Sequence, residues 1–250
     1  MYTISLLNMK GGVGKTTTSV NLATGIAMQG HSTLLVDLDP QSNTTSMFLN
    51  EDPEIAAHNL LKGEVPTTDA ILSVGEKLWL IPSELSLANT ETELRVQTNA
   101  PQHNRLQKAL SQVKDRFQYC IVDCPPILNL LTLNAIITSD LIIVPIKPDR
   151  FALRGYGVTM QNISQIREHW ELSLDVKVLF TIVNRNNEER DIITHLRELD
   201  GVKAYSTVIR SQPKPIASAS SRMYAVITDT SKGAVVAEDM RAFVAEVLGG

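Results

Sequence analysis

Short apolar runs alternate with longer segments of helical spacing along this chain of 250 residues. Five runs are apolar enough to form buried strands, and they cover residues 2–8, 33–37, 118–123, 141–146 and 176–183. A sixth strand is expected at 77–82. Near-continuous apolar strands separated by helix-length segments are typical of a parallel sheet that is covered on both faces. The pattern therefore predicts an α/β fold with a mostly parallel, twisted sheet and helices on both faces.

Two helices are indicated by the spacing of their apolar residues. The first covers residues 15–29, directly after the first strand, and Gly30 is expected to end it. The last covers roughly residues 233–248, whereas the acidic segment 50–75 predicts an irregular connection with short helical pieces. We see no internal repeat, and a chain of this length can bury one sizeable core, so residues 1–250 are predicted to form a single domain.

Composition narrows the class of protein. Hydrophobic residues make up 43% of the chain, yet none of the apolar runs reaches the roughly 18 residues of a membrane-spanning helix, and no signal-peptide pattern occurs. We therefore expect a cytoplasmic protein. Cys120 and Cys124 lack the spacing of a zinc site, and four residues along a strand do not favour a disulfide, so both are expected to be core thiols.

A glycine-rich segment links the first strand to the first helix. Residues 10–16 read K-G-G-V-G-K-T, a loop whose backbone N–H groups can cradle phosphates. Lys15 is expected to contact the β- and γ-phosphates and Thr16 to bind Mg²⁺. Met9 stands where the standard motif has its first glycine, and a second lysine, Lys10, follows it. The predicted nucleotide-binding residues of this loop are Lys10, Gly11, Gly12, Val13, Gly14, Lys15, Thr16 and Thr17.

The loop resembles the deviant Walker A motif of the ParA/MinD family of ATPases, which implies a P-loop fold. Residues 37–41 (D-L-D-P-Q) resemble the D-x-D-P-Q segment of that family, and residues 123–126 (D-C-P-P) resemble its Walker B end, in the same order. The resemblance runs through most of the chain and weakens in 50–115. It implies that the chain binds ATP with Mg²⁺. It also implies that Lys10 is the signature lysine, which reaches the ATP of a partner copy in a nucleotide-sandwich homodimer.

Three aspartates follow predicted strands. Asp37, Asp39 and Asp123 lie at or just beyond the carboxyl ends of two of them, where ligands bind in open α/β sheets. Mg²⁺ prefers one or two carboxylates with several waters, and hydrolysis needs a group that positions the attacking water. By resemblance, Asp39 positions that water, Asp123 holds a metal-bound water and Asp37 supports the magnesium shell. Each aspartate alone also fits an exposed loop start or a helix N-cap. The predicted catalytic residues are Lys10, Lys15 and Asp39, and the predicted metal-binding residues are Thr16, Asp37 and Asp123.

The base pocket is predicted from weaker signals. Asn184 and Arg185 resemble the N-R pair of the family, in which the asparagine reads the adenine edge, although an Asx-type turn is the alternative. Segment 205–216 resembles the loop that closes over the base. Residues 125–134 are expected to form switch II, and 151–155 resemble a family segment near the dimer face.

Basic residues gather late in a chain whose net charge is −4. Residues 203–232 contain five basic residues and one acidic residue, and the basic ones are Lys203, Arg210, Lys214, Arg222 and Lys232. Ordinary solvated charges would explain such a set. The resemblance to ParA proteins, whose ATP-bound dimers bind DNA non-specifically, favours a surface for DNA phosphates. The predicted DNA-binding residues are Lys203, Arg210, Arg222 and Lys232.

The leading interpretation is an ATP-dependent DNA partition ATPase. Its ATP-bound homodimer would bind double-stranded DNA of the nucleoid, and a ParB-type centromere-binding protein would stimulate hydrolysis. Without a built-in arginine finger the intrinsic rate should be slow. No helix-turn-helix segment precedes the glycine loop, so sequence-specific operator binding is not expected.

Three alternatives share parts of this pattern. A MinD-like positioning ATPase would need a basic amphipathic C-terminal helix, whereas Glu238, Asp239 and Glu246 outnumber Arg241 in the last helix here, so membrane binding is not expected. An iron-sulfur reductase would need cluster cysteines in two loops. A dethiobiotin-synthetase type of enzyme would need a dedicated substrate pocket, and the D-P-Q segment favours the partition group instead.

Overall fold

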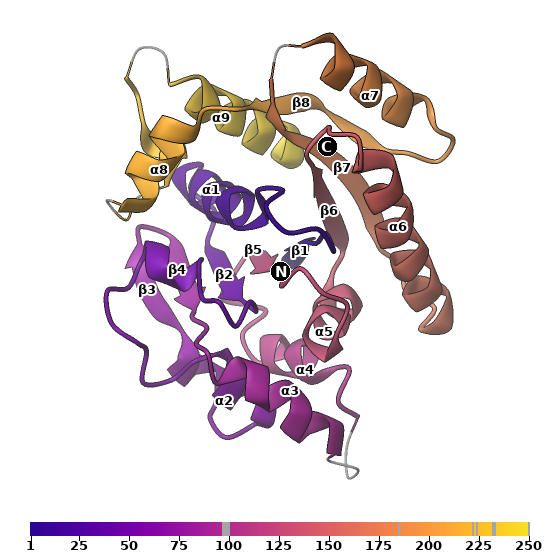
Figure 1. The fold of residues 1–250 in the computed structure, drawn as a ribbon. Helices are drawn as coiled ribbons and strands as arrows, with labels where there is room; N and C mark the ends of the chain where they lie inside the picture. The colour runs from indigo at the N-terminus through magenta and orange to yellow at the C-terminus, as the bar shows by residue number, and fades with distance from the viewer. Residues whose placement is uncertain (97–100, 185, 222, 224, 232–233, 250) are drawn as a thin grey trace.

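The computed structural model describes residues 1–96, 101–184, 186–221, 223, 225–231 and 234–249. Within them an eight-stranded sheet has the order β3-β4-β2-β5-β1-β6-β7-β8 (Figure 1). Every neighbouring pair is parallel except β3 and β4. The strands are β1 Tyr2–Leu6, β2 Thr33–Asp37, β3 Leu72–Gly75, β4 Leu78–Ile81, β5 Tyr119–Asp123, β6 Leu141–Ile146, β7 Asp175–Val183 and β8 Ala204–Arg210. The predicted mostly parallel sheet is confirmed.

Helices cover both faces of the sheet. Leu35 of β2 packs with residues of α1 and α9, whereas its neighbours Leu34 and Val36 pack with residues of α2 to α7. The helices are α1 Lys15–Met28, α2 Ala57–Lys62, α3 Leu87–Val96, α4 Arg105–Ser111, α5 Leu130–Thr138, α6 Ala152–His169, α7 Asn187–Glu198, α8 Pro213–Ser221 and α9 Val235–Gly249. Side chains that alternate across fully buried strands explain why the strands are apolar at nearly every position.

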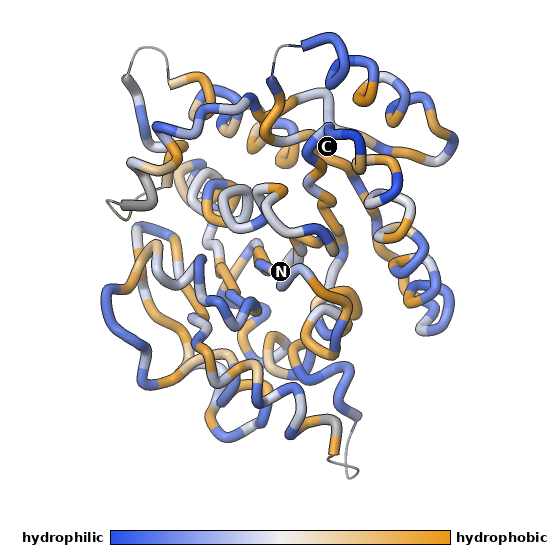
Figure 2. The backbone as a smooth tube through the Cα atoms, viewed as in Figure 1, coloured by the Kyte–Doolittle hydropathy of each residue, from blue (hydrophilic) through white to orange (hydrophobic). Residues whose placement is uncertain are grey.

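Hydropathy follows these layers. Strands β6 and β7 run as largely hydrophobic segments through the middle of the molecule, whereas α7 at its rim is mostly hydrophilic (Figure 2). Cys120 and Cys124 are free and buried, as expected. None of the helices in the described parts of the chain is long and apolar enough to cross a membrane.

Two stretches differ from the sequence-based expectation. The end of the connection expected at 50–75 forms β3, which pairs antiparallel with β4 through an irregular register near Gly75. The segment expected as a loop at 205–216 instead contains most of strand β8, a two-residue connection and the start of α8. Pro213 and Pro215 do not prevent that helix, because proline is tolerated in the first turn, where N–H groups have no intrahelical acceptor.

Candidate nucleotide site

The glycine loop connects β1 to α1 at the carboxyl edge of the sheet. Gly12 and Gly14 have φ angles of 70° and 84°, a conformation that glycine adopts without strain. A Cβ atom at Gly11 would meet nothing within 4 Å, so the backbone of the loop does not itself require glycine there. Thr181 of β7 donates its hydroxyl to the carbonyl of Val13 at 2.7 Å. The loop between β1 and α1 is therefore also fastened to β7.

Lys15 lies at the bottom of the loop. Its side chain donates to the carbonyl oxygens of Asn8 and Lys10, both at 3.1 Å, and the residue is only 7% exposed. Burial lowers the pKa of this ammonium, and the nearby Asp123 opposes that effect. A buried cation held by backbone carbonyls is well placed to exchange them for phosphate oxygens.

Lys10 turns away from the site that Lys15 occupies. Its ammonium contacts Asp149 at 2.5 Å, in the connection between β6 and α6, and lies 5.7 Å from the ring centre of Phe151. Although partial burial opposes it, the hydrogen bond from Lys10 lowers the pKa of Asp149. The Lys10 side chain is 34% exposed. The two lysines of the loop are therefore presented to different surroundings.

Asp123 joins the loop to the sheet. Its carboxylate accepts hydrogen bonds from the hydroxyls of Thr16 at 2.8 Å, Thr44 at 2.7 Å and Ser19 at 3.0 Å. The residue is buried, and burial raises the pKa of its carboxyl despite these bonds. Asp37 is its direct neighbour in the sheet register. Two buried acids thus stand side by side beneath the loop.

Asp37 and Asp39 have different surroundings. Asp37 accepts from the backbone N–H groups of Asp39 and Thr45 and from the Thr45 hydroxyl, so its oxygens hold the loop 39–45. Burial, followed by repulsion from Asp123, raises the pKa of Asp37 to about 8. Asp39 instead lines the cavity beside the glycine loop.

The donor set at this edge fits magnesium. No group of three or more His, Cys, Asp or Glu side chains in the described residues has the arrangement of a protein-only metal cage. The Thr16 hydroxyl and the Asp123 carboxylate lie 2.8 Å apart, next to Asp39 and the cavity. Proteins usually bind Mg²⁺ through few protein oxygens, together with retained waters and substrate phosphates.

A cavity of about 660 Å³ extends from the loop toward the C-terminal elements. One wall contains the loop and the start of α1, including Lys15 and Thr16. The other wall is formed by β8, α8 and α9, which contribute Ile209, Ile216 and Met240. A polar end beneath an apolar end suits a nucleotide, whose phosphates and base need those two environments. Ile209 and Ile216 lie in segment 205–216, which was expected to close over the base, whereas Met240 was not singled out from the sequence.

Asn184 is not part of this cavity. Its side-chain amide donates to Glu189 at 2.8 Å, and its backbone N–H also donates to that carboxylate. Asn186 caps α7 through the backbone N–H of Glu189. This is the local hydrogen bonding expected of a turn, and the residue expected to read the base faces α7. Its predicted partner Arg185 lies outside the described residues.

The cations predicted to contact DNA have acidic neighbours. The guanidinium of Arg210 makes bonds of 2.5–3.1 Å to Asp239, and Lys203 pairs with Asp175 at 2.7 Å. The hydrogen bond to Asp239 raises the pKa of Arg210. Counting charges in 203–232 missed both acids, because they lie on other elements. Arg222 and Lys232 lie outside the described residues, and the assignment of all four to DNA stays a prediction.

The chain is similar in sequence to a known protein family and to chromosome partitioning proteins. The family described as AAA domain matches residues 1–176. The sporulation initiation inhibitor protein Soj of Bacillus subtilis is 38% identical over 211 residues, covering 82% of this chain and 83% of that protein. The chromosome partitioning protein ParA of Caulobacter vibrioides is 35% identical, covering 82% and 79%.

One solved structure adds a bound nucleotide. It is described as cobyrinic acid a,c-diamide synthase from Mycobacterium smegmatis with a bound ATP analogue and magnesium. It superposes with a TM-score of 0.83 at 28% identity and covers 99% of this chain and 94% of that one. The fold and the loop are therefore compatible with magnesium and an adenine nucleotide in a protein of this shape.

Proposed function

This chain belongs to the ParA/MinD family of P-loop ATPases, close to its Soj-type members, and from that premise we propose that it is an ATP-dependent DNA partition ATPase. The observation that carries the proposal is the separation of its two loop lysines. Lys15 is buried at the phosphate end of the cavity, whereas Lys10 is held by Asp149 at a partly exposed position away from it. A lysine that does not serve its own nucleotide is available to a second copy.

ATP and Mg²⁺ are the ligands that the site suits. The N–H groups of the glycine loop and the ammonium of Lys15 would bind the phosphates, since Gly12, Gly14 and Lys15 line the polar end of the cavity. Thr16 and Asp123 would hold the metal ion, which neutralises charge on the phosphate oxygens. Asp39 would orient the attacking water from the cavity wall. The apolar wall of Ile209 and Met240 would exclude water from the base.

ATP-dependent dimerisation follows from the position of Lys10. Its neighbour Phe151 is 51% exposed, and Ile127 and Leu128, which follow the Asp123 motif, are 54% and 45% exposed. Exposed apolar residues beside a phosphate-binding loop are suited to a contact that forms when nucleotide is present. The dimer would bind nucleoid DNA through cations of the C-terminal region, and the candidates are Lys203, Arg210, Arg222 and Lys232.

A ParB-type partner would set the rate. Among the described residues that line the cavity, Lys15 and Arg210 are the basic ones, and Arg210 is bound to Asp239. A site with this composition should hydrolyse ATP slowly and be reset when a partner supplies or orders further charge.

Dimerisation tests the proposal. Light scattering after size exclusion should give a dimer with ATP and a monomer with ADP. Lys10→Ala should bind ATP as a monomer, whereas Lys108→Ala, which removes an exposed lysine on α4, should behave as wild type. A Lys10→Ala protein that dimerises with ATP like wild type would remove the assigned role of this lysine.

A further inference from the structure

Ser83 lies just after β4, next to the loop that carries Asp39. The residue is 1% exposed, although serine is usually found at the surface. We propose that Ser83 is a positioning residue for Asp39, holding the loop 39–45 in the conformation that ATP hydrolysis requires. The inference rests on the proposed ATPase function, because it assigns to Ser83 control of the group that orients the attacking water.

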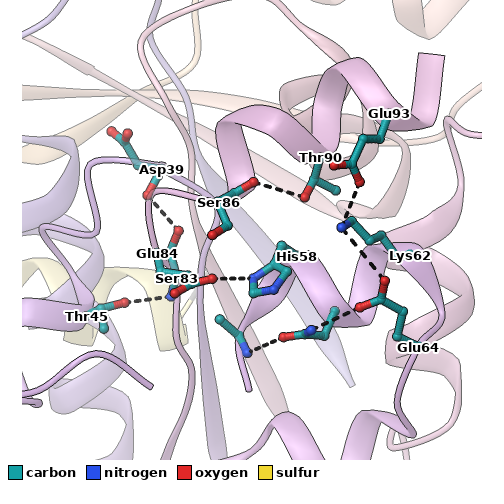
Figure 3. A network of polar contacts seen from close by, with 12 residues as sticks. Asp39, Thr45, His58, Lys62, Glu64, Ser83, Glu84, Ser86, Thr90 and Glu93 are labelled. Atoms are coloured by element: carbon teal, nitrogen blue, oxygen red, sulfur yellow. Dashed lines mark hydrogen bonds and ion pairs between the residues drawn. The ribbon is translucent and has the colours of Figure 1, made fainter. Parts of the chain in front are cut away.

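Two hydrogen bonds from Ser83 reach both ends of the loop 39–45 (Figure 3). Its hydroxyl donates to the backbone carbonyl of Asp39 at 2.8 Å. Its backbone N–H donates to the hydroxyl of Thr45, also at 2.8 Å, and that hydroxyl donates to Asp37. One residue therefore fixes the first and last members of the loop relative to each other.

The segment that carries Ser83 is itself anchored to α2. Glu84 pairs with His58 at 3.0 Å, and the carbonyl of Pro82 accepts from the backbone N–H of Ala57 at 2.8 Å. Figure 3 shows the contact between Glu84 and His58 and, next to it, the hydrogen bond between Ser83 and Asp39. Contacts on both sides keep the Ser83 hydroxyl at a fixed distance from the loop, as a group that orients another residue must be.

The chemistry explains why this bond matters for the reaction rather than for binding. The Asp39 carbonyl that Ser83 holds belongs to the same residue as the carboxylate at the cavity wall, so rotation of that peptide displaces the carboxylate. Phosphate binding instead depends on the glycine loop and Lys15, whereas the hydrogen bonds of Ser83 within the described residues go to Asp39 and Thr45. Loss of the hydroxyl should lower kcat and leave ATP affinity intact.

Ser83→Ala tests this assignment. We expect kcat to fall about tenfold, since small misplacements of an orienting group cost one to two orders of magnitude, while the Kd for a fluorescent ATP analogue stays within about twofold. Ser83→Thr keeps a hydroxyl and should restore most of kcat. The control is Ser46→Ala, which removes an exposed bond of the same type, from Ser46 to the Ser42 carbonyl at 2.9 Å, near the end of the same loop.

A measurement without nucleotide gives a second readout. Amide hydrogen exchange in residues 39–45 should be faster in Ser83→Ala than in wild type and unchanged around Lys15. Wild-type kcat in Ser83→Ala would overturn the inference and leave the ATPase proposal standing. Loss of ATP affinity in parallel with kcat would also overturn it, since a general structural role predicts that result. Absence of hydrolysis in the wild-type protein would overturn both.

Discussion

Replacement of Asp123 by asparagine separates the stability of the site from its function. The carboxylate is buried beside Asp37, and burial raises its pKa even though Thr16, Thr44 and Ser19 donate to it. For a carboxyl whose pKa is raised in the folded state, ionisation opposes folding, so stability falls as the pH rises through that pKa. Near neutral pH, Asp123→Asn should therefore stabilise the nucleotide-free protein.

The magnitude follows from two opposing effects. Replacing a buried ion pair by apolar residues of similar volume ranges from neutral to stabilising by about 4 kcal/mol, which bounds the gain from neutralising this one carboxylate. An amide keeps only some of the three hydrogen bonds to Thr16, Thr44 and Ser19, and this loss reduces the gain in stability by about 1 kcal/mol. A net gain of about 1–2 kcal/mol corresponds to a rise in Tm of roughly 2–8 °C for a chain of this size.

Thermal unfolding at pH 7 with and without Mg²⁺ and ATP is the assay. Asp123→Asn should melt higher than wild type without ligand and gain less from Mg²⁺ and ATP, because the negative charge proposed to hold the metal ion is lost. Asp140→Asn is the control, since that carboxylate is exposed and accepts one bond from the backbone of Thr3 at 2.7 Å; its Tm should not rise. A ligand-free Asp123→Asn protein that melts below wild type would refute the reasoning about buried charge.

Three further predictions concern single residues. Lys15→Ala should abolish ATP binding measured by titration calorimetry, and wild-type affinity would contradict the phosphate-loop assignment. Gly25→Ala should lower the free energy of unfolding in urea by about 1–2 kcal/mol, although alanine has the better helix propensity. The reason is that the new Cβ would lie 2.5 Å from a Val244 methyl and 2.6 Å from an Ile227 methyl. An unchanged unfolding midpoint would show that α9 moves to accommodate the new methyl group. Hydrogen bonds from Thr207 and Ser206 lower the pKa of Glu246 to about 2, although burial opposes this shift. Glu246→Gln should therefore be less stable than wild type above about pH 4.5, and the difference in stability should vanish as the pH falls toward 2. A difference in stability that does not change with pH would reject this role of the Glu246 carboxylate.

The fold was largely predictable because its strands are buried on both faces. The strands 33–37 and 141–146 were predicted with the observed ends, since every residue in them is buried and apolar runs mark such strands directly. Strand β3 was missed because it lies at the sheet edge and alternates between partly exposed and exposed residues. Five of the seven residues of β8 are likewise not buried, and most of this strand was mistaken for a loop.

In the site, too, residues within contiguous motifs could be predicted from the sequence, whereas contacts between distant residues could not. The loop 10–16 and the aspartates could be predicted because contiguous motifs carry them. The contact of Lys10 with Asp149 and the pairing of Arg210 with Asp239 join residues 139 and 29 positions apart, and no spacing rule reports such pairs. Ser83 gave no signal in the sequence, because its role depends on the packing of β4 against β2.

Binding to arbitrary duplex DNA is the property that most directly distinguishes a partition ATPase. Equilibrium binding should be measured by fluorescence anisotropy with ATP, with ADP and without nucleotide, at two salt concentrations and with two unrelated sequences. A partition ATPase should bind DNA tightly only with ATP, equally for both sequences and more weakly at high salt, because phosphate contacts release counterions. Binding that is equally strong with ADP, or no binding with ATP at low salt, would contradict a partition ATPase.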